Sequence, residues 1–166
     1  LKLELLKAHR HVLFPYIIGR YMSRELSDIK SVSLTAIAVN SVYFVYFVVV
    51  VDETLLNTVD VTKGIKEGGA ILINTERSGE ELLPLLNGYE GRVYTINARE
   101  VCERTLGKYF PNTPMLAAIV AVSGCVDKIQ FIEDMKTSYQ HKFAKKPQAI
   151  EGNLNCLAEA MVAVRE

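Results

Sequence analysis

The sequence lacks the cysteine pairs that would hold a metal ion or an iron–sulfur cluster. Its 166 residues include three cysteines, Cys102, Cys125 and Cys156, which lie far apart and form no Cys-x-x-Cys pair. A cluster or a structural zinc held by this chain alone is therefore not expected. The three histidines have no partner at ligand spacing, so no metal site is predicted. An odd, sparse set of cysteines without a signal peptide favours a reducing, cytoplasmic setting.

The sequence also has no excess of charge, because Lys plus Arg and Asp plus Glu number 19 each. A neutral chain has no net attraction for nucleic acid or for an anionic membrane, so neither partner is expected. One apolar run, 32–51, is about as long as a bilayer span. Strand-forming Val, Ile, Tyr and Phe dominate it, and Asn40-Ser41 interrupts it with a turn signal. We therefore expect two consecutive strands rather than a membrane helix.

Signatures of catalysis are missing as well. No Gly-x-Gly-x-x-Gly follows a strand pattern, no phosphate-binding loop ends in Gly-Lys-Ser or Gly-Lys-Thr, and no Gly-x-Ser-x-Gly occurs. No pair of carboxylates shares an apolar face that would separate their acidities. The sequence therefore predicts no catalytic residue on this chain and favours a binding or assembly role.

What the sequence does contain is a regular alternation of short strand and helix patterns from residue 34 onward. Such alternation is typical of an α/β fold, here a three-layer, Rossmann-like domain with a mostly parallel sheet. No linker or repeat interrupts it, so residues 1–166 are predicted to form a single domain that ends in a helical segment. The expected strands are 34–39, 43–51, 70–74 and 92–96, and the expected helices are 55–66, 80–86, 98–106, 115–122, 128–139 and 150–164.

Turn residues place the ends of several of these elements. Gly68-Gly69 is expected to end the helix at 55–66, and Gly107 to close the helix at 98–106. Asn112-Thr113-Pro114 resembles the start of a helix, with Thr113 as the N-cap and proline in the first turn.

Polar residues follow the predicted strands, and in open α/β sheets ligands bind beyond the carboxyl ends of the strands. Ordinary structural roles compete with this interpretation, because aspartate caps helices and asparagine and threonine favour turns. Both readings stay open for each residue. The candidates for ligand or subunit contact are Asp52, Glu53, Asn74, Thr75, Asn97, Asn112 and Thr113.

Six phrases, taken together and in order, resemble the gamma subunit or gamma domain of 2-oxoacid:ferredoxin oxidoreductases, the pyruvate synthase family. No single phrase is diagnostic, but six at suitable intervals are fairly specific. They are VVDETLL at 50–56, VTKG at 61–64, GGAILINT at 68–75, VYTINA at 93–98, PNTPMLAA at 111–118 and KFAKKPQAIEGNLNCLAEA at 142–160.

The resemblance implies a role inside a complex that oxidatively decarboxylates a 2-oxoacid, usually pyruvate, with coenzyme A and reduces ferredoxin. Thiamine diphosphate, Mg²⁺ and [4Fe-4S] clusters would be held by alpha, beta and delta partner subunits, and no cofactor by this chain. Coenzyme A is a candidate ligand of the complex. The 2-oxoglutarate, 2-oxoisovalerate and indolepyruvate types of the family remain alternatives.

The resemblance is weak in the first forty residues. Family members open with a strand and a Gly-x-Gly-Gly-x-Gly turn, which this sequence lacks, so we expect that opening to be missing before Leu1. Residues 19–30, GRYMSRELSDIK, match the family's Gly-Pro-Glu-Arg-Gly-Gly-like loop poorly. Two other hypotheses therefore remain: a stand-alone Rossmann-like protein that binds a nucleotide cofactor, and an α/β scaffold without a ligand.

Overall fold

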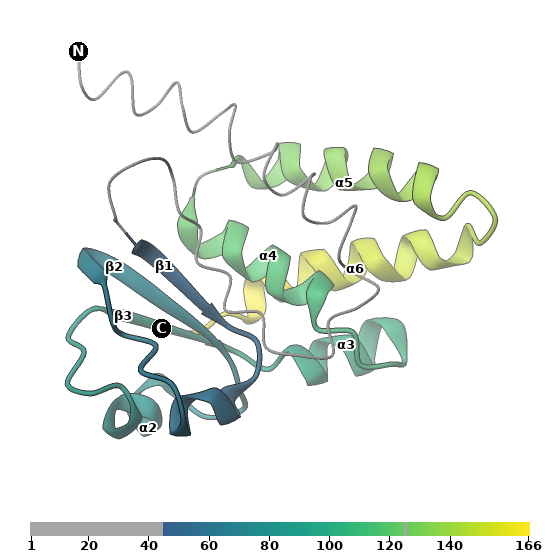
Figure 1. The fold of residues 1–166 in the computed structure, drawn as a ribbon. Coiled ribbons are helices and arrows are strands. Elements are labelled where there is room, and N and C mark those ends of the chain that lie inside the picture. The colour runs from purple at the N-terminus through teal and green to yellow at the C-terminus, as the bar shows by residue number, and fades with distance from the viewer. Residues whose placement is uncertain (1–44, 125) are drawn as a thin grey trace, which may run out of the picture.

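The most apolar stretches of the chain form a parallel sheet. The computed structural model describes residues 45–124 and 126–166, in which strands β1 (Val45–Val50), β2 (Ile65–Asn74) and β3 (Arg92–Ile96) lie in the order β1-β2-β3 (Figure 1). Both neighbouring pairs are parallel. The side chains of Ile71, Leu72 and Ile73 in the middle strand are fully buried, as in a sheet covered on both faces. The prediction of a parallel sheet is confirmed.

Short helical turns cover one face of this sheet. The 3-10 helix η1 (Glu53–Asn57) follows β1, and α2 (Gly79–Leu82) with the 3-10 turn η2 (Leu83–Leu85) joins β2 to β3. Leucines of these turns pack against the strand side chains that point to this face and form a small core. Its buried members are Val48, Val50, Leu55, Leu56, Val61, Ile71, Ile73, Leu82, Leu86 and Val93.

Four longer helices form the layer on the other face. They are α3 (Ala98–Leu106), α4 (Asn112–Ser123), α5 (Lys128–Lys142) and α6 (Gln148–Ala163), and Figure 1 shows α4 and α6 between the sheet and α5. A helix that is apolar around its whole circumference has to be buried, and the α4 sequence NTPMLAAIVAVS is of that kind. The predicted α/β fold with a helical C-terminal segment is confirmed. The layer of short turns on one face of the sheet is thin, and the layer of four helices on the other face is thick.

The helix after β3 begins and ends where its capping residues predict. The side-chain oxygen of Asn97 accepts a hydrogen bond from the Glu100 amide at 3.0 Å, which satisfies one of the free N–H groups of the first turn. Gly107 follows the last residue with a φ of 63°, a left-handed conformation that glycine adopts without strain. The predictions for the strand at 92–96 and the helix at 98–106 are confirmed to the residue.

The predicted helix at 55–66 is wrong. Only η1 forms there, and the chain then turns and enters β2 at Ile65. Asp60 accepts hydrogen bonds from both the backbone amide and the hydroxyl of Thr62, the kind of side-chain bond that stabilises a turn in competition with a helix. Gly64 completes the turn with a φ of 84°.

Gly68-Gly69 does not end a helix but lies within β2. The register pairs Val45 with Ile65 and then Phe47 with Ala70, so β2 carries extra residues opposite β1. Gly68 has a φ of 77°. Irregularities of this kind often contain a glycine, because glycine adopts a positive φ without strain. The strand predicted at 70–74 is therefore the regular half of a longer strand.

The predicted N-cap at Thr113 is also wrong. Helix α4 begins at Asn112 after Pro111, so Thr113 and Pro114 lie inside the first turn. Proline is tolerated there because first-turn N–H groups have no partner within the helix. The helix expected at 80–86 is split into α2 and η2, with Pro84 in the first turn of η2.

The C-terminal segment protects the outer edge of β3. Thr95 and Arg165 exchange two backbone hydrogen bonds, of 2.8 and 2.9 Å, in an isolated antiparallel bridge. A Cβ atom on Gly79 would lie 3.4 Å from the Val93 carbonyl oxygen, so the start of α2 packs against the same edge. Covering an edge in this way prevents it from pairing with another chain.

Several expectations concern residues outside the described part. These are the strand at 34–39, most of the apolar run at 32–51, and Cys125. Within residues 45–124 and 126–166, no helix is long and apolar enough to cross a membrane.

The hydroxyl of Thr95 provides a test of the core. It is buried and has no hydrogen-bond partner among the described residues. We expect Thr95→Val to raise the free energy of unfolding by about 1 kcal/mol, because the substitution removes an unsatisfied polar group at nearly constant volume. Chemical denaturation measures the change. In the control, Thr105→Val, a hydroxyl that donates to the Val101 carbonyl at 2.8 Å is lost, so stability should fall. A loss of stability in Thr95→Val would contradict this account.

Candidate functional site

The carboxyl ends of the three strands meet around the side chain of Asn74, the last residue of the middle strand. Its amide nitrogen donates to the Val51 carbonyl at 2.9 Å and to the Tyr109 hydroxyl at 3.0 Å. Its amide oxygen accepts from the backbone N–H of Ala98 at 3.1 Å. One side chain thus joins the end of β1, the start of α3 and the loop between α3 and α4.

Thr75 and Asn97 lie beside Asn74 and have structural partners as well. The Thr75 backbone amide donates to the Ile96 carbonyl at 2.9 Å, and its hydroxyl accepts from the Arg77 amide at 3.1 Å. Thr75 is buried, whereas Asn97 is partly exposed and caps α3. Thr75 and Asn97 therefore lie at the same edge of the sheet as Asn74.

Asp52 and Glu53 continue the same edge after β1. Asp52 caps η1 by accepting from the Thr54 amide at 3.0 Å and the Thr54 hydroxyl at 2.7 Å, so the capping interpretation is confirmed. These bonds hold the pKa of the Asp52 carboxyl below its usual value. The Oε2 atom of Glu53 is buried and has no hydrogen-bond partner among the described residues.

Asn112 and Thr113 lie at the start of α4. Thr113 donates to the Asn153 side chain at 3.3 Å, which links α4 to α6 inside the helical layer. Asn112 is exposed at the first position of α4. No hydrogen bond of the described residues connects either side chain to the strand ends.

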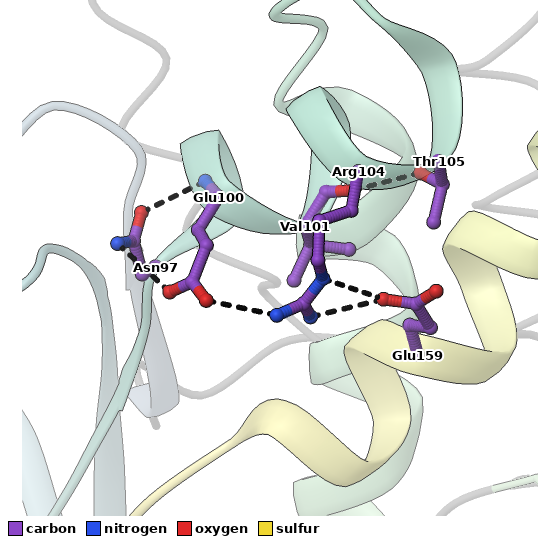
Figure 2. Close-up of polar contacts among 6 residues, drawn as sticks. All are labelled: Asn97, Glu100, Val101, Arg104, Thr105 and Glu159. Carbon is purple, nitrogen blue, oxygen red and sulfur yellow. Dashed lines mark hydrogen bonds and ion pairs between the residues drawn. The ribbon is translucent and has the colours of Figure 1, made fainter.

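A second polar cluster joins α3 to α6 and is drawn in Figure 2. The Arg104 guanidinium pairs with Glu100 one turn earlier at 2.8 Å and with Glu159 of α6 at 2.9 Å. Asn97 donates to Glu100 at 3.4 Å and so connects this cluster to the strand ends. The three charged side chains are half-exposed, so water screens the pairs and their contribution to stability is small.

A shallow groove of about 470 Å³ runs along this cluster to the C-terminal segment. Arg165 forms its far end and donates from Nη2 to the Glu76 carbonyl at 3.2 Å, which holds the loop after β2 in place. Charges of both signs line the groove. Its charged and polar members are Glu76, Asn97, Glu100, Arg104, Glu159 and Arg165.

The polar side chains at this edge are bonded mainly to the loops that follow the strands. Within the described part of the chain, the hydrogen bonds join side chains to backbone groups or to each other, and none pairs a nucleophile with a histidine base. No group of three histidine, cysteine or acidic side chains among the described residues could hold a metal ion. The arrangement fits a site that holds its own loops in a fixed conformation.

Sequence reasoning missed Tyr109, Arg104, Glu159 and Arg165. The four-residue spacing of Glu100 and Arg104 on a predicted helix could have indicated their ion pair. The partnership with Glu159 joins residues 55 apart in the chain, and that of Asn74 with Tyr109 joins residues 35 apart. No local pattern signals such pairs.

Comparison with known proteins assigns the fold to a family. The family model described as pyruvate ferredoxin/flavodoxin oxidoreductase matches residues 31–163. The chain belongs to this family. The resemblance indicated by the sequence phrases is therefore confirmed.

Individual members of the pyruvate ferredoxin/flavodoxin oxidoreductase family are similar over part of their length. The common subunit gamma of pyruvate/ketoisovalerate oxidoreductases from Thermococcus litoralis is 38% identical over 100 residues, 60% of this chain and 54% of that protein. Pyruvate synthase subunit PorC from Thermotoga maritima is 32% identical over 120 residues, 71% of this chain and 59% of that protein. The chain thus spans little more than half the length of these two relatives.

A solved structure from the same family has the same fold. The crystal structure of pyruvate oxidoreductase subunit PORC (EC 1.2.7.1) from Thermotoga maritima matches with a TM-score of 0.65 at 29% identity. The match covers 75% of this chain and 66% of that one. The parallel sheet and its helices are therefore shared with a subunit of an oxidoreductase.

Replacing Asn74 tests its position at the centre of the strand ends. We expect Asn74→Ala to lower the free energy of unfolding by about 2–3 kcal/mol, because a carbonyl, an amide and a hydroxyl lose their partner together. Thermal or chemical unfolding measures the loss. Asn112→Ala is the matched control, since the exposed Asn112 has no side-chain hydrogen bond to a described residue, and it should stay within about 0.5 kcal/mol. Equal losses in both variants would contradict the role of Asn74.

Tyr139 predicts a pH dependence of stability. Burial raises the pKa of its phenol to about 12, above the usual 10, even though a hydrogen bond with Thr113 opposes the shift. A raised pKa in the folded state means that stability is complete below about pH 10 and is lost as the pH rises toward 12. In Tyr139→Phe, unfolding between pH 9 and 11 should depend less on pH than in the unmodified protein. Identical slopes in the two proteins would refute the shift.

Proposed function

We propose that this chain is the gamma subunit of a pyruvate-type 2-oxoacid:ferredoxin oxidoreductase. The complex would decarboxylate pyruvate oxidatively with coenzyme A, giving acetyl-coenzyme A and reduced ferredoxin. The observation that carries the proposal is the family match over 31–163, in a fold shared with a pyruvate oxidoreductase subunit.

The chemistry of such a complex would reside mainly in partner subunits. We assign thiamine diphosphate, Mg²⁺ and [4Fe-4S] clusters to the alpha, beta and delta subunits. Among the described residues, no three histidine, cysteine or acidic side chains lie together as the ligands of a metal ion would, and Cys102 and Cys156 are both in the core.

The role of this chain would be to complete and stabilise the assembly rather than to select the 2-oxoacid. The relative from Thermococcus litoralis is named as a gamma subunit common to pyruvate and ketoisovalerate oxidoreductases. A subunit shared by two such enzymes cannot by itself decide between their substrates. We therefore propose that the choice of substrate lies in the partner subunits.

Purification of the chain with its natural partners tests this function. An affinity-tagged chain expressed in its own host should bring down proteins with thiamine-diphosphate and ferredoxin-type sequences, identified by mass spectrometry. The purified material should reduce a viologen dye only when both pyruvate and coenzyme A are present.

Substrate controls in the same assay separate the members of the family. Dye reduction with 2-oxoglutarate, 2-oxoisovalerate or indolepyruvate but not with pyruvate would reassign the complex within it. A chain that purifies without partners and binds a nucleotide cofactor by itself would overturn the proposal in favour of a stand-alone Rossmann-like protein.

A further inference from the structure

The loop between α3 and α4, residues 107–111, presents two adjacent aromatic side chains to solvent. Tyr109 is 38% exposed and Phe110 is 56% exposed. We refer to residues 107–111 as the aromatic loop. The other large exposed hydrophobic residues of the described chain stand singly, on different elements, namely Val59, Leu83, Ile129 and Val162.

The exposed rings lie on a rigid support. The Tyr109 hydroxyl accepts from Asn74 at 3.0 Å, and the Arg99 guanidinium lies 4.4 Å from the centre of the Tyr109 ring, within range of a cation–π interaction. The Cys102 thiol donates to the Phe110 carbonyl at 3.2 Å. These contacts hold the Tyr109 side chain and the Phe110 backbone in place.

Both ends of the aromatic loop are fixed as well. Gly107 closes α3 in the left-handed conformation, and the Pro111 carbonyl accepts the first hydrogen bond of α4, from the Met115 amide at 2.9 Å. A loop held in one conformation loses little conformational entropy when it binds a partner. This property is what a binding anchor requires.

Two positively charged side chains, Lys108 and Arg99, lie near the aromatic rings. Lys108 precedes the two aromatic residues, is exposed, and forms no ion pair with any described residue. Arg99 has an exposed partner, Glu103, at 3.8 Å. An aromatic centre with a polar rim is the usual composition of a protein interface, and the exposed Lys108 ammonium favours a surface that carries carboxylates.

We propose that the aromatic loop is the point at which a partner subunit of the oxidoreductase docks. The partner surface would provide an apolar pocket for Phe110 and at least one carboxylate for Lys108. Tyr109 would hold the loop in position through Asn74. This inference rests on the function proposed above, in which the chain binds partner subunits. It identifies the part of this chain to which one of them binds.

Substitution of Phe110 in the complete complex is the principal test. Phe110→Ala should weaken association with the partner subunits at least about tenfold, because an aromatic anchor at the centre of an interface carries much of the binding energy. Association is measured by co-purification with the tagged chain and by titration of the isolated partner. Leu83→Ala and Ile129→Ala are the matched controls, since both remove an exposed hydrophobic side chain elsewhere, and both should bind as the unmodified chain does.

Substitution of Lys108 tests the predicted carboxylate. Lys108→Glu should weaken binding more than Lys108→Ala, and the difference between the two variants should shrink as salt is raised, because salt screens exposed charges. Unfolding temperatures within a few degrees of that of the unmodified chain would show that every variant is folded. Equal binding of Lys108→Glu and Lys108→Ala at low salt would overturn the predicted charge.

The outcomes separate this inference from the proposed function. If the unmodified chain brings down no partner, the proposed function fails, and the docking proposal fails with it. If the unmodified chain and Phe110→Ala assemble equally well, the function stands and the docking proposal is overturned. The proposal is also overturned if Phe110→Ala abolishes self-association of this chain while binding to the partner is unchanged, since the loop would then bind a second copy.

Discussion

The side chain of Asn74 fixes the carboxyl edge of the sheet, around which the loops after the strands are arranged. Buried backbone groups need hydrogen-bond partners, and the end of a strand leaves some of them without one. Asn74 supplies a donor to the Val51 carbonyl and an acceptor to the Ala98 amide. It can reach both because it ends the middle strand. Its bond to Tyr109 then couples the strand ends to the aromatic loop, so sheet and loop form one rigid surface.

The two faces of the sheet are covered unequally, and this inequality shapes the molecule. Short turns with a few leucines cover one face, whereas the other carries the four helices α3, α4, α5 and α6 (Figure 1). Among the described residues the interior is mostly apolar, and its buried polar side chains are Thr75 and Thr95. The role proposed for this chain, a subunit that offers a fixed surface to partners, is compatible with such a core.

Local patterns predicted best those elements whose limits are set by neighbouring residues. The helix from Ala98 to Leu106 has its cap in Asn97 and its stop in Gly107, so the sequence alone locates it. In the stretch at 55–66, turn bonds between Asp60 and Thr62 interrupt the expected helix. The double glycine at 68–69 was ambiguous because glycine serves both helix ends and strand irregularities, and only pairing with β1 decides between them.

The sequence by itself determined the α/β class, the parallel sheet, the position of the polar edge and the family, because each depends on periodicity, turn residues or ordered phrases within short distances. The tertiary structure alone decided which polar residues are partners. It joined Asn74 to Tyr109 and Arg104 to Glu159, and it placed Thr113 in the helical layer, away from the strand ends. These contacts join segments separated by 35 residues or more in sequence, so they depend on how helices and strands pack, which local patterns do not encode.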